Sequence, residues 1–227
     1  MNTQQIGDTY AVLARAFAFP AADLWERLEG TPLPELLADV EASDMLESLV
    51  RQQAFPRRSQ EEREADFIGT FELGQVPQYE GLCRKEEGRE GLIEEVLRFY
   101  HYFGLRLSDE HRDFPDSFVT ELEFMQYLVA LEQKALEEGR DPASLRRAQF
   151  DFLERHLTRW AERLPQLMAA RRASDSYRLL AECMHAFALA HRDALRSAVG
   201  ADEIPLPEGD RSGEQQMPPF LERGECQ

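Results

Sequence analysis

Apolar residues recur at helical spacing along most of the chain, and the pattern is clearest between residues 114 and 131. One face of this stretch is apolar, at Phe118, Leu122, Met125 and Val129. Pro115 and Asp116 interrupt the preceding segment, and Asp116 or Ser117 can accept a hydrogen bond from the free N–H groups of a new helix. Glu121 and Glu123 fall in its first turns, where the helix dipole favours negative charge. The pattern predicts a long helix with one core-facing side, which begins at a joint between two halves of the chain.

The same spacing predicts helices on both sides of this joint, each bounded by a cap or a helix breaker. Before the joint, helices are expected from Ile6 to Pro20, around Trp25 up to Gly30, from Pro34 to Val50, from the Ser59–Glu62 capping box to Gly74, and from Arg89 to a left-handed Gly104. After it, they are expected from Asp141 and Pro142 onward, with a bend or restart at Pro165, and from a cap at Ser174 or Asp175 to Gly200. No stretch shows the alternation of a β-strand.

These patterns predict an all-α protein, with a single helical domain of about nine to ten helices in residues 1–200. We expect two lobes, about residues 1–104 and 116–200, joined near residues 105–117. Residues 201–227 form a tail rich in Pro, Gly and Glu, which cannot bury enough apolar surface to fold alone. A short apolar segment of this tail, from Met217 to Leu221, can dock on the body.

The charge of the 227-residue chain is strongly negative, with a net value of −17. The excess is concentrated in residues 1–141, which carry 30 acidic and 14 basic side chains. Such a field repels nucleic acid and anionic lipid and attracts cationic partners, although acidic helix faces also serve simply to keep a protein in solution. No run of eighteen apolar residues is present, and the first ten residues lack the features of an export signal. We therefore expect a cytoplasmic protein with no stable membrane insertion and no nucleic-acid partner.

Residues for catalysis or metal binding are sparse. The three cysteines, Cys83, Cys183 and Cys226, are far apart and show no paired spacing of a zinc site or disulfide framework. Glu182 and His185 form one E-x-x-H pair, but a di-metal bundle needs a second such pair and two further glutamates. We therefore interpret His185 as structural and His156 as a partly buried histidine with a hydrogen-bond partner. The sequence predicts no enzyme, no cofactor and no metal.

Several blocks in the middle of the chain carry a resemblance to a known family. They are Ala65–Phe71 (ADFIGTF), Pro77–Glu80 (PQYE), Phe99–Tyr100 with Phe103–Leu105 (FGL), Pro115–Met125 (PDSFVTELEFM) and, more faintly, Phe152–Trp160. In this order, and over roughly residues 60–165, the chain resembles the TorD/DmsD/NarJ group of cytoplasmic chaperones. Within that group it is most similar to chaperones of respiratory molybdenum enzymes related to dimethyl sulfoxide reductase, with the branch serving type II enzymes as the expected placement.

The resemblance implies an all-helical protein that binds the apo catalytic subunit of a molybdenum-cofactor oxidoreductase, often through its twin-arginine signal peptide, until the cofactor is inserted. Such a leader carries guanidinium groups followed by an apolar stretch, so a receptor needs carboxylates at its edge and apolar walls. Ser117 stands where the family commonly has histidine, which puts a direct contact by residue 117 in question. The residues expected to bind the client are Phe67, Phe71, Tyr79, Glu80, Asp116, Ser117, Glu121 and Glu123.

Other interpretations of these residues remain open at this stage. Phe67 and Phe71 also fit core positions, Asp116 also fits a helix cap, and Glu121 and Glu123 also fit a solvated face. At the level of function, the alternatives are a helical adaptor or regulator that binds a folded partner without recognising a signal peptide, and an enzyme such as the di-metal bundle. The sequence names neither the client nor the oligomeric state, and it contains no phosphate-binding motif that would support nucleotide binding.

Overall fold

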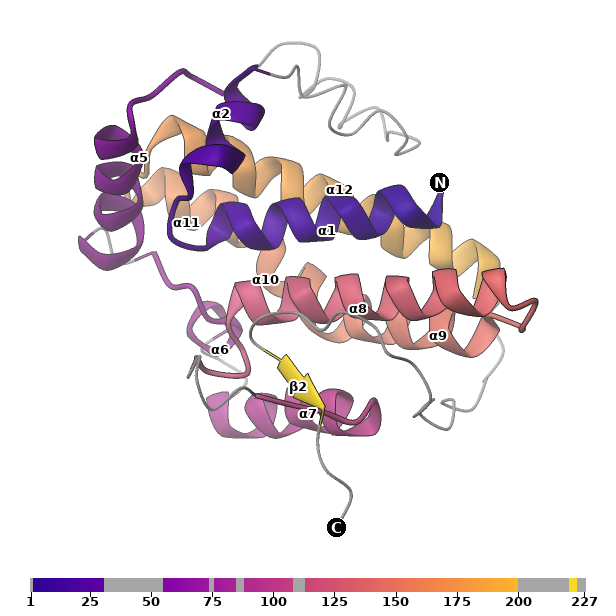
Figure 1. The fold of residues 1–227 in the computed structure, drawn as a ribbon. Helices are drawn as coiled ribbons and strands as arrows, with labels where there is room; N and C mark the ends of the chain where they lie inside the picture. Colours follow the sequence, from indigo (N-terminus) through magenta and orange to yellow (C-terminus); the bar gives the residue numbers. More distant parts are fainter. Residues whose placement is uncertain are drawn as a thin grey trace.

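Helices form nearly all of the computed structural model, which describes residues 2–30, 55–73, 76–84, 88–107 and 113–199 together with the backbone of 221–223 (Figure 1). The α-helices are α1 (Thr3–Phe17), α2 (Ala22–Gly30), α5 (Gln60–Phe67), α6 (Glu80–Cys83), α7 (Arg89–Tyr102), α8 (Phe118–Glu137), α9 (Ala143–Phe152), α10 (Thr158–Ala161), α11 (Leu164–Ala170) and α12 (Asp175–Val199). Two π-helical segments, η1 (Ile68–Leu73) and η3 (Leu153–Leu157), continue α5 and α9. The prediction of an all-α protein is confirmed.

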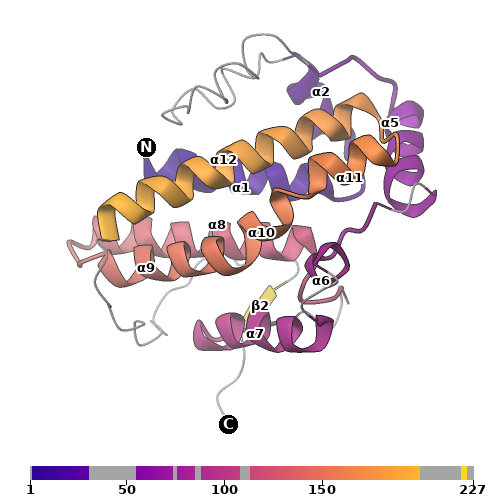
Figure 2. The same cartoon turned by 180° about the vertical axis from the view of Figure 1, so that it is seen from behind.

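Helix α8 lies at the centre of the fold. Helix α1 runs along one side of it in the opposite direction, α9 returns beside it, and α12 spans α1 and α9 (Figures 1 and 2). On the side of α7, the ring of Phe124 lies 4.8 Å from those of Tyr100 and Phe152. The expectation of a single core-facing side on α8 is therefore wrong. Because helices pack around it on several sides, α8 also buries Glu121, Glu123 and Glu132.

Most of the predicted helix boundaries agree with the structure. Ser59 and Glu62 form the expected capping box, and Gly104 adopts a positive φ of 70° after α7. Ser174 accepts a hydrogen bond from the backbone N–H of Tyr177 at the start of α12, and Pro165 lies in the first turn of α11. The predicted helix from 34 to 50, the thiol of Cys226 and most of the tail lie outside the described residues.

The start of α8 is built differently from the expectation. Ser117 occupies the N-cap position, but its side chain makes no capping hydrogen bond, and Asp116 is directed toward another element. The helix that begins with α9 continues through η3 and α10 to residue 161, and after a turn at 162–163 the chain restarts as α11, as Pro165 predicts. The π-helical segment η3 was not expected; there the Thr158 hydroxyl donates to the carbonyl of Leu153 at 2.7 Å. Such wide turns leave little trace in the hydrophobic period.

A short two-stranded sheet joins the tail to the body. Strand β1 (Leu105–Leu107) pairs antiparallel with β2 (Leu221–Arg223), with Leu107 opposite Leu221. The sequence predicted no strand, because three residues are too few to show alternation. Part of the expected connector is thus β1. The buried apolar side chains form one cluster that includes α1 and α8, and the division into two lobes stays a prediction.

Candidate functional site

The segment from Val76 to Arg84 crosses the N-terminal end of α8 and is fixed there by backbone hydrogen bonds. The N–H of Phe118 donates to the carbonyl of Gln78 at 3.0 Å, and the N–H of Glu80 donates to that of Asp116 at 2.8 Å. Tyr79 and Ser117 form an isolated antiparallel bridge. These contacts bring five of the predicted residues together, namely Tyr79, Glu80, Asp116, Ser117 and Glu121.

Asp116 is fully buried and links α6 to α7. One carboxylate oxygen accepts from the backbone N–H of Gly81 at 3.1 Å, so Asp116 caps α6 instead of α8. The same oxygen accepts from Arg89 Nε at 3.1 Å, and the other accepts from Arg89 Nη2 at 3.2 Å. This two-point geometry suits a guanidinium group and a carboxylate, and the hydrogen bond to Asp116 raises the pKa of Arg89 further.

The guanidinium of Arg89 also lies against two aromatic rings. Its central carbon is 4.6 Å from the ring centre of Phe114 and 5.3 Å from that of Tyr79. The two rings meet edge to face at 5.6 Å. Phe114 is 53% exposed, so this group of side chains reaches the surface. Burial raises the pKa of the Tyr79 hydroxyl to about 12, so it stays protonated at neutral pH.

Two further carboxyl groups, those of Glu80 and Glu121, lie deeper in the protein. Glu80 is fully buried, pairs with Arg84 and lies 3.0 Å from His156 Nδ1. Glu121 accepts a hydrogen bond from Trp160 Nε1 at 2.7 Å, and the charge of Glu80 acts on it from nearby. Burial first, and then the charge of Glu80, raise the pKa of Glu121 well above its ordinary value.

Arginines tie this end of α8 to the following helices. Arg84 donates to the carbonyl of Arg155 at 2.7 Å, and Arg163 donates to that of Cys83 at 3.2 Å. Figure 2 shows α6 beside the corner between α10 and α11. The interpretation of His156 as a histidine with a hydrogen-bond partner is confirmed, and it is buried more completely than expected.

The remaining predicted residues lie elsewhere. Phe67 and Phe71 are buried, with rings 5.0 Å apart, and the ring of Phe71 lies 4.9 Å from that of Tyr177. Glu123 is buried farther along α8. The expectation of carboxylates at an exposed edge does not match this geometry, because Asp116, Glu80 and Glu121 are inside and have partners within the chain. Whether any of these residues binds a client stays a prediction.

Sequence reasoning missed the partners of the carboxylates. Arg84 is four residues after Glu80, and that helical spacing was the available signal. Arg89, Phe114 and Trp160 gave none, because each pairs with residues far away in the chain. The candidate site is therefore a carboxylate held by an arginine near the surface, above a buried cluster of Glu80, Glu121, His156 and Trp160.

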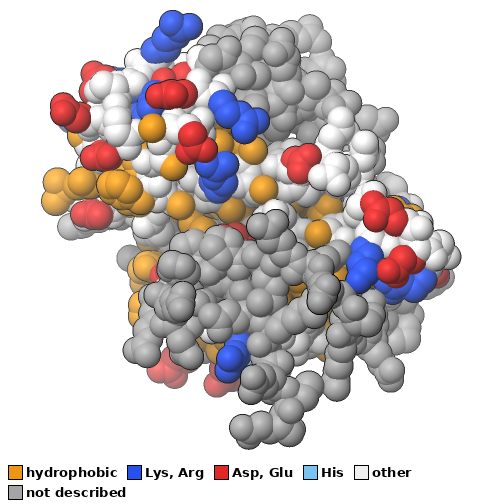
Figure 3. All heavy atoms as spheres, viewed as in Figure 1, with side chains coloured by type: hydrophobic (Ala, Val, Ile, Leu, Met, Phe, Trp, Pro, Cys, Tyr) orange, Lys and Arg blue, Asp and Glu red, His pale blue; other side chains and the backbone are white. Residues whose placement is uncertain are grey.

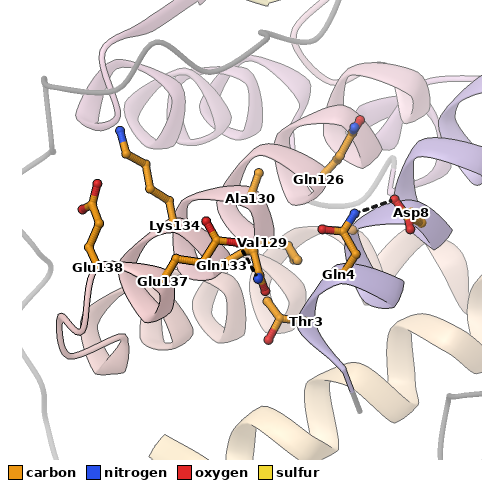
Figure 4. Close-up of a pocket in the computed structure, with 11 residues that line it drawn as sticks. Thr3, Gln4, Asp8, Gln126, Val129, Ala130, Gln133, Lys134, Glu137 and Glu138 are labelled. Carbon is orange, nitrogen blue, oxygen red and sulfur yellow. Dashed lines mark hydrogen bonds between the residues drawn. The ribbon is translucent and has the colours of Figure 1, made fainter.

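A polar groove is present at the other end of α8, between α1 and α8, with a volume of about 460 Å³. Gln4 and Asp8 project from α1, and Gln133, Lys134 and Glu137 project from α8 (Figure 4). Gln4 donates to Asp8 at 3.0 Å, and Gln133 donates to Glu137 at 2.8 Å. These side chains thus satisfy one another along each helix, and the groove shows no set of groups aimed at a common ligand.

Within the described ranges, no three His, Cys, Asp or Glu side chains are grouped so that they could hold a metal ion. Cys83 and Cys183 are buried, and burial raises the pKa of each thiol to about 12, which leaves them unreactive at neutral pH. None of the helices that the structure describes has the length and apolar character needed to cross a membrane.

Comparison with known proteins places the chain in a family. Residues 33–166 match the family described as nitrate reductase delta subunit. The chain is 34% identical over 199 residues to the selenate reductase assembly chaperone protein of Thauera selenatis, covering 86% of this chain and 91% of that one. It is 35% identical over 173 residues to the chlorate reductase assembly chaperone protein of Ideonella dechloratans, covering 74% and 79%. A third relative, the perchlorate reductase assembly chaperone protein of Dechloromonas aromatica (strain RCB), is 36% identical over 139 residues, covering 60% and 62%.

The chain belongs to the nitrate reductase delta subunit family, and the predicted membership in the TorD/DmsD/NarJ group is confirmed. These relatives are named as assembly chaperones and not as enzymes, which agrees with the prediction of a non-catalytic protein.

Proposed function

We propose that this protein is a cytoplasmic assembly chaperone that holds the apo catalytic subunit of a molybdenum-cofactor oxidoreductase until the cofactor has been inserted, and that it recognises the subunit through a twin-arginine signal peptide. The observation that carries this proposal is the similarity to reductase assembly chaperones along most of both chains, which extends to 91% of the selenate reductase relative.

The surface offers the apolar contacts that a leader peptide needs. Phe19, Leu73, Leu82 and Phe114 are large apolar side chains that are exposed in the structure. Apolar side chains gather on the surface below α5 (Figure 3). Isolated exposed apolar residues are common on any protein, but aromatic and leucine side chains close to a carboxylate–arginine pair suit a peptide in which arginines precede an apolar stretch.

The charge of the chain supports the same partner. A net charge of −17 attracts a cationic leader and speeds its encounter with the protein. Because the Debye length falls from about 8 Å at 0.15 M salt to about 3 Å at 1 M, this attraction should weaken markedly as salt is added.

Calorimetry with synthetic leaders tests the proposal. We expect a peptide with Arg-Arg followed by an apolar stretch to bind with strong salt sensitivity, and a version without Arg or Lys to bind much more weakly. Equal affinity for the two peptides would exclude recognition of the twin arginines. Binding of the catalytic subunit that survives deletion of its leader would indicate the adaptor function instead.

A further inference from the structure

Arg89 occupies a site that is shaped for a guanidinium group. Asp116 supplies two carboxylate oxygens, at 3.1 and 3.2 Å from Arg89 Nε and Nη2. Phe114 and Tyr79 supply two aromatic rings at 4.6 and 5.3 Å from the central carbon. A buried carboxylate with aromatic faces beside it is a strong combination for arginine, because it joins two-point hydrogen bonding to cation–π attraction.

Arg89 can leave this site more easily than Asp116, because its side chain is far more exposed to solvent. Asp116 is fully buried, but the side chain of Arg89 is 31% exposed. Arg89 is the first residue of α7 and follows Gly88, which is the N-cap. No side chain caps this end of the helix by a hydrogen bond. Withdrawal of Arg89 therefore breaks no helix cap. Arg84 is different, because its side chain is only 10% exposed and also holds the carbonyl of Arg155.

The surroundings of Arg89 match a peptide in which an apolar stretch follows an arginine. Phe114 is itself a wall of the site and is half exposed, and Leu82, the residue after Gly81, is 38% exposed. The stem of Arg89 lies so close to α6 that a Cβ added at Gly81 would be 2.4 Å from Arg89 Cγ. Gly81 thus leaves room for the stem of an arginine at this position.

We propose that the site formed by Asp116, Tyr79 and Phe114 is the receptor for one arginine of the client leader, and that Arg89 fills it in the free protein as an internal competitor. This inference rests on the proposed function for the identity of the client. The incoming guanidinium takes the place of Arg89, which moves into solvent, and takes over its two hydrogen bonds, so Asp116 is paired both in the free protein and in the complex. The internal pair lowers the apparent affinity for the leader, because only the fraction of molecules with Arg89 withdrawn is competent to bind.

Two variants separate the competitor from the site. Arg89→Ala empties the site, and Arg89→Gln empties it of the guanidinium while keeping a stem against Gly81. The matched control is Arg98→Ala, which removes an arginine from the same helix, where its Nε donates to the carbonyl of Glu94. We expect both Arg89 variants to bind the Arg-Arg leader at least about fivefold more tightly than the wild type, because the competing guanidinium is gone, and Arg98→Ala to bind like the wild type.

A second measurement does not depend on the client. N-acetyl-arginine amide at millimolar concentration should raise the melting temperature of both Arg89 variants more than that of the wild type, and N-acetyl-lysine amide should not. Leader affinity that is unchanged or lowered in both variants overturns the inference while leaving the proposed function in place. Stabilisation by the arginine amide without leader binding by any form supports the guanidinium site and counts against leader recognition. Absence of both effects overturns the inference.

Discussion

Trp160 donates its indole N–H to the carboxyl group of Glu121 at 2.7 Å, and both side chains are fully buried. The same indole ring stacks on Phe118, with centroids 3.8 Å apart and planes 7° apart. Through these two contacts α10 is fixed to the first turns of α8, directly beneath the segment that carries Glu80. The packing of α10 on the start of α8 therefore depends on a buried carboxyl group that Trp160 hydrogen-bonds.

Replacement of Trp160 with Phe should destabilise the fold by about 2–4 kcal/mol, because it removes the donor from a buried carboxyl group and leaves a small cavity. Urea unfolding followed by circular dichroism measures this loss. Trp25→Phe is the matched control, because the buried Nε1 of Trp25 has no hydrogen-bond partner among the described residues, and its cost should be clearly smaller. Equal losses in the two variants would show that the hydrogen bond to Glu121 contributes nothing.

Glu121→Gln should stabilise the protein at pH 8 and flatten its dependence on pH. The folded state raises the pKa of Glu121, so the proton that the unfolded chain releases is retained on folding. The carboxyl group of Glu121 contributes its full stabilisation at pH values below the ordinary glutamate pKa of about 4.5. This stabilisation is lost as the pH rises through the raised pKa of the folded state. Glutamine resembles the protonated form because it is uncharged, and its amide oxygen can still accept from Trp160. Urea unfolding at pH 6 and pH 8 tests this, and a wild type as stable as the variant at pH 8 contradicts it.

His191 should make the fold sensitive to acid. Burial lowers the pKa of His191 to about 3, and its Nδ1 lies 2.9 Å from the hydroxyl of Tyr10. A histidine whose pKa is lowered in the folded state contributes its full stabilisation of the fold above about pH 6.5. This stabilisation is lost as the pH falls toward the pKa of the folded state. Between pH 7 and pH 5 the wild type should lose about 1–2 kcal/mol that His191→Gln does not lose. His101→Gln, on the exposed side of α7, serves as the control and should keep the wild-type slope.

Gly81→Ala should destabilise the protein by about 1–3 kcal/mol, because the new methyl group would meet Arg89 Cγ at 2.4 Å and one oxygen of Asp116 at 3.0 Å. Gly91→Ala is the control in α7, where nothing lies within 4 Å of the added carbon. That change should stabilise the helix by up to about 1 kcal/mol. Thermal unfolding of the two variants gives the comparison, and two shifts of the same sign would argue against a close fit at Gly81.

The sequence predicted the elements better than it predicted their contacts. Ser59, Gly104 and Pro165 act locally, through bonds and backbone angles within a few residues, so their effects can be derived from the chain alone. Asp116 shows the limit of this approach. It had the sequence features of a cap for α8, but its partners, Gly81 and Arg89, lie about 30 residues earlier, and only the fold brings them together.

The sequence predicted which residues lie together at the candidate site better than it predicted their burial and their partners. The resemblance identified two segments that cross in the structure. Five of the predicted residues therefore lie together: Tyr79, Glu80, Asp116, Ser117 and Glu121. Their burial could not be foreseen, since it depends on Arg84, Arg89 and Trp160 reaching the carboxyl groups from other helices. Phe67 and Phe71 illustrate the converse, because aromatic residues at helical spacing are placed in a core by the packing of neighbours such as Tyr177.

The proposed role as an assembly chaperone is tested most directly by the binding of the purified protein to the catalytic subunit of its oxidoreductase in two forms, one without and one with the molybdenum cofactor, both carrying the leader. Isothermal titration should show tight binding of the apo subunit and at least tenfold weaker binding of the cofactor-loaded subunit, because a chaperone of assembly must release its finished client. Equal affinity for the two forms, or no binding of the apo subunit, would contradict the proposal.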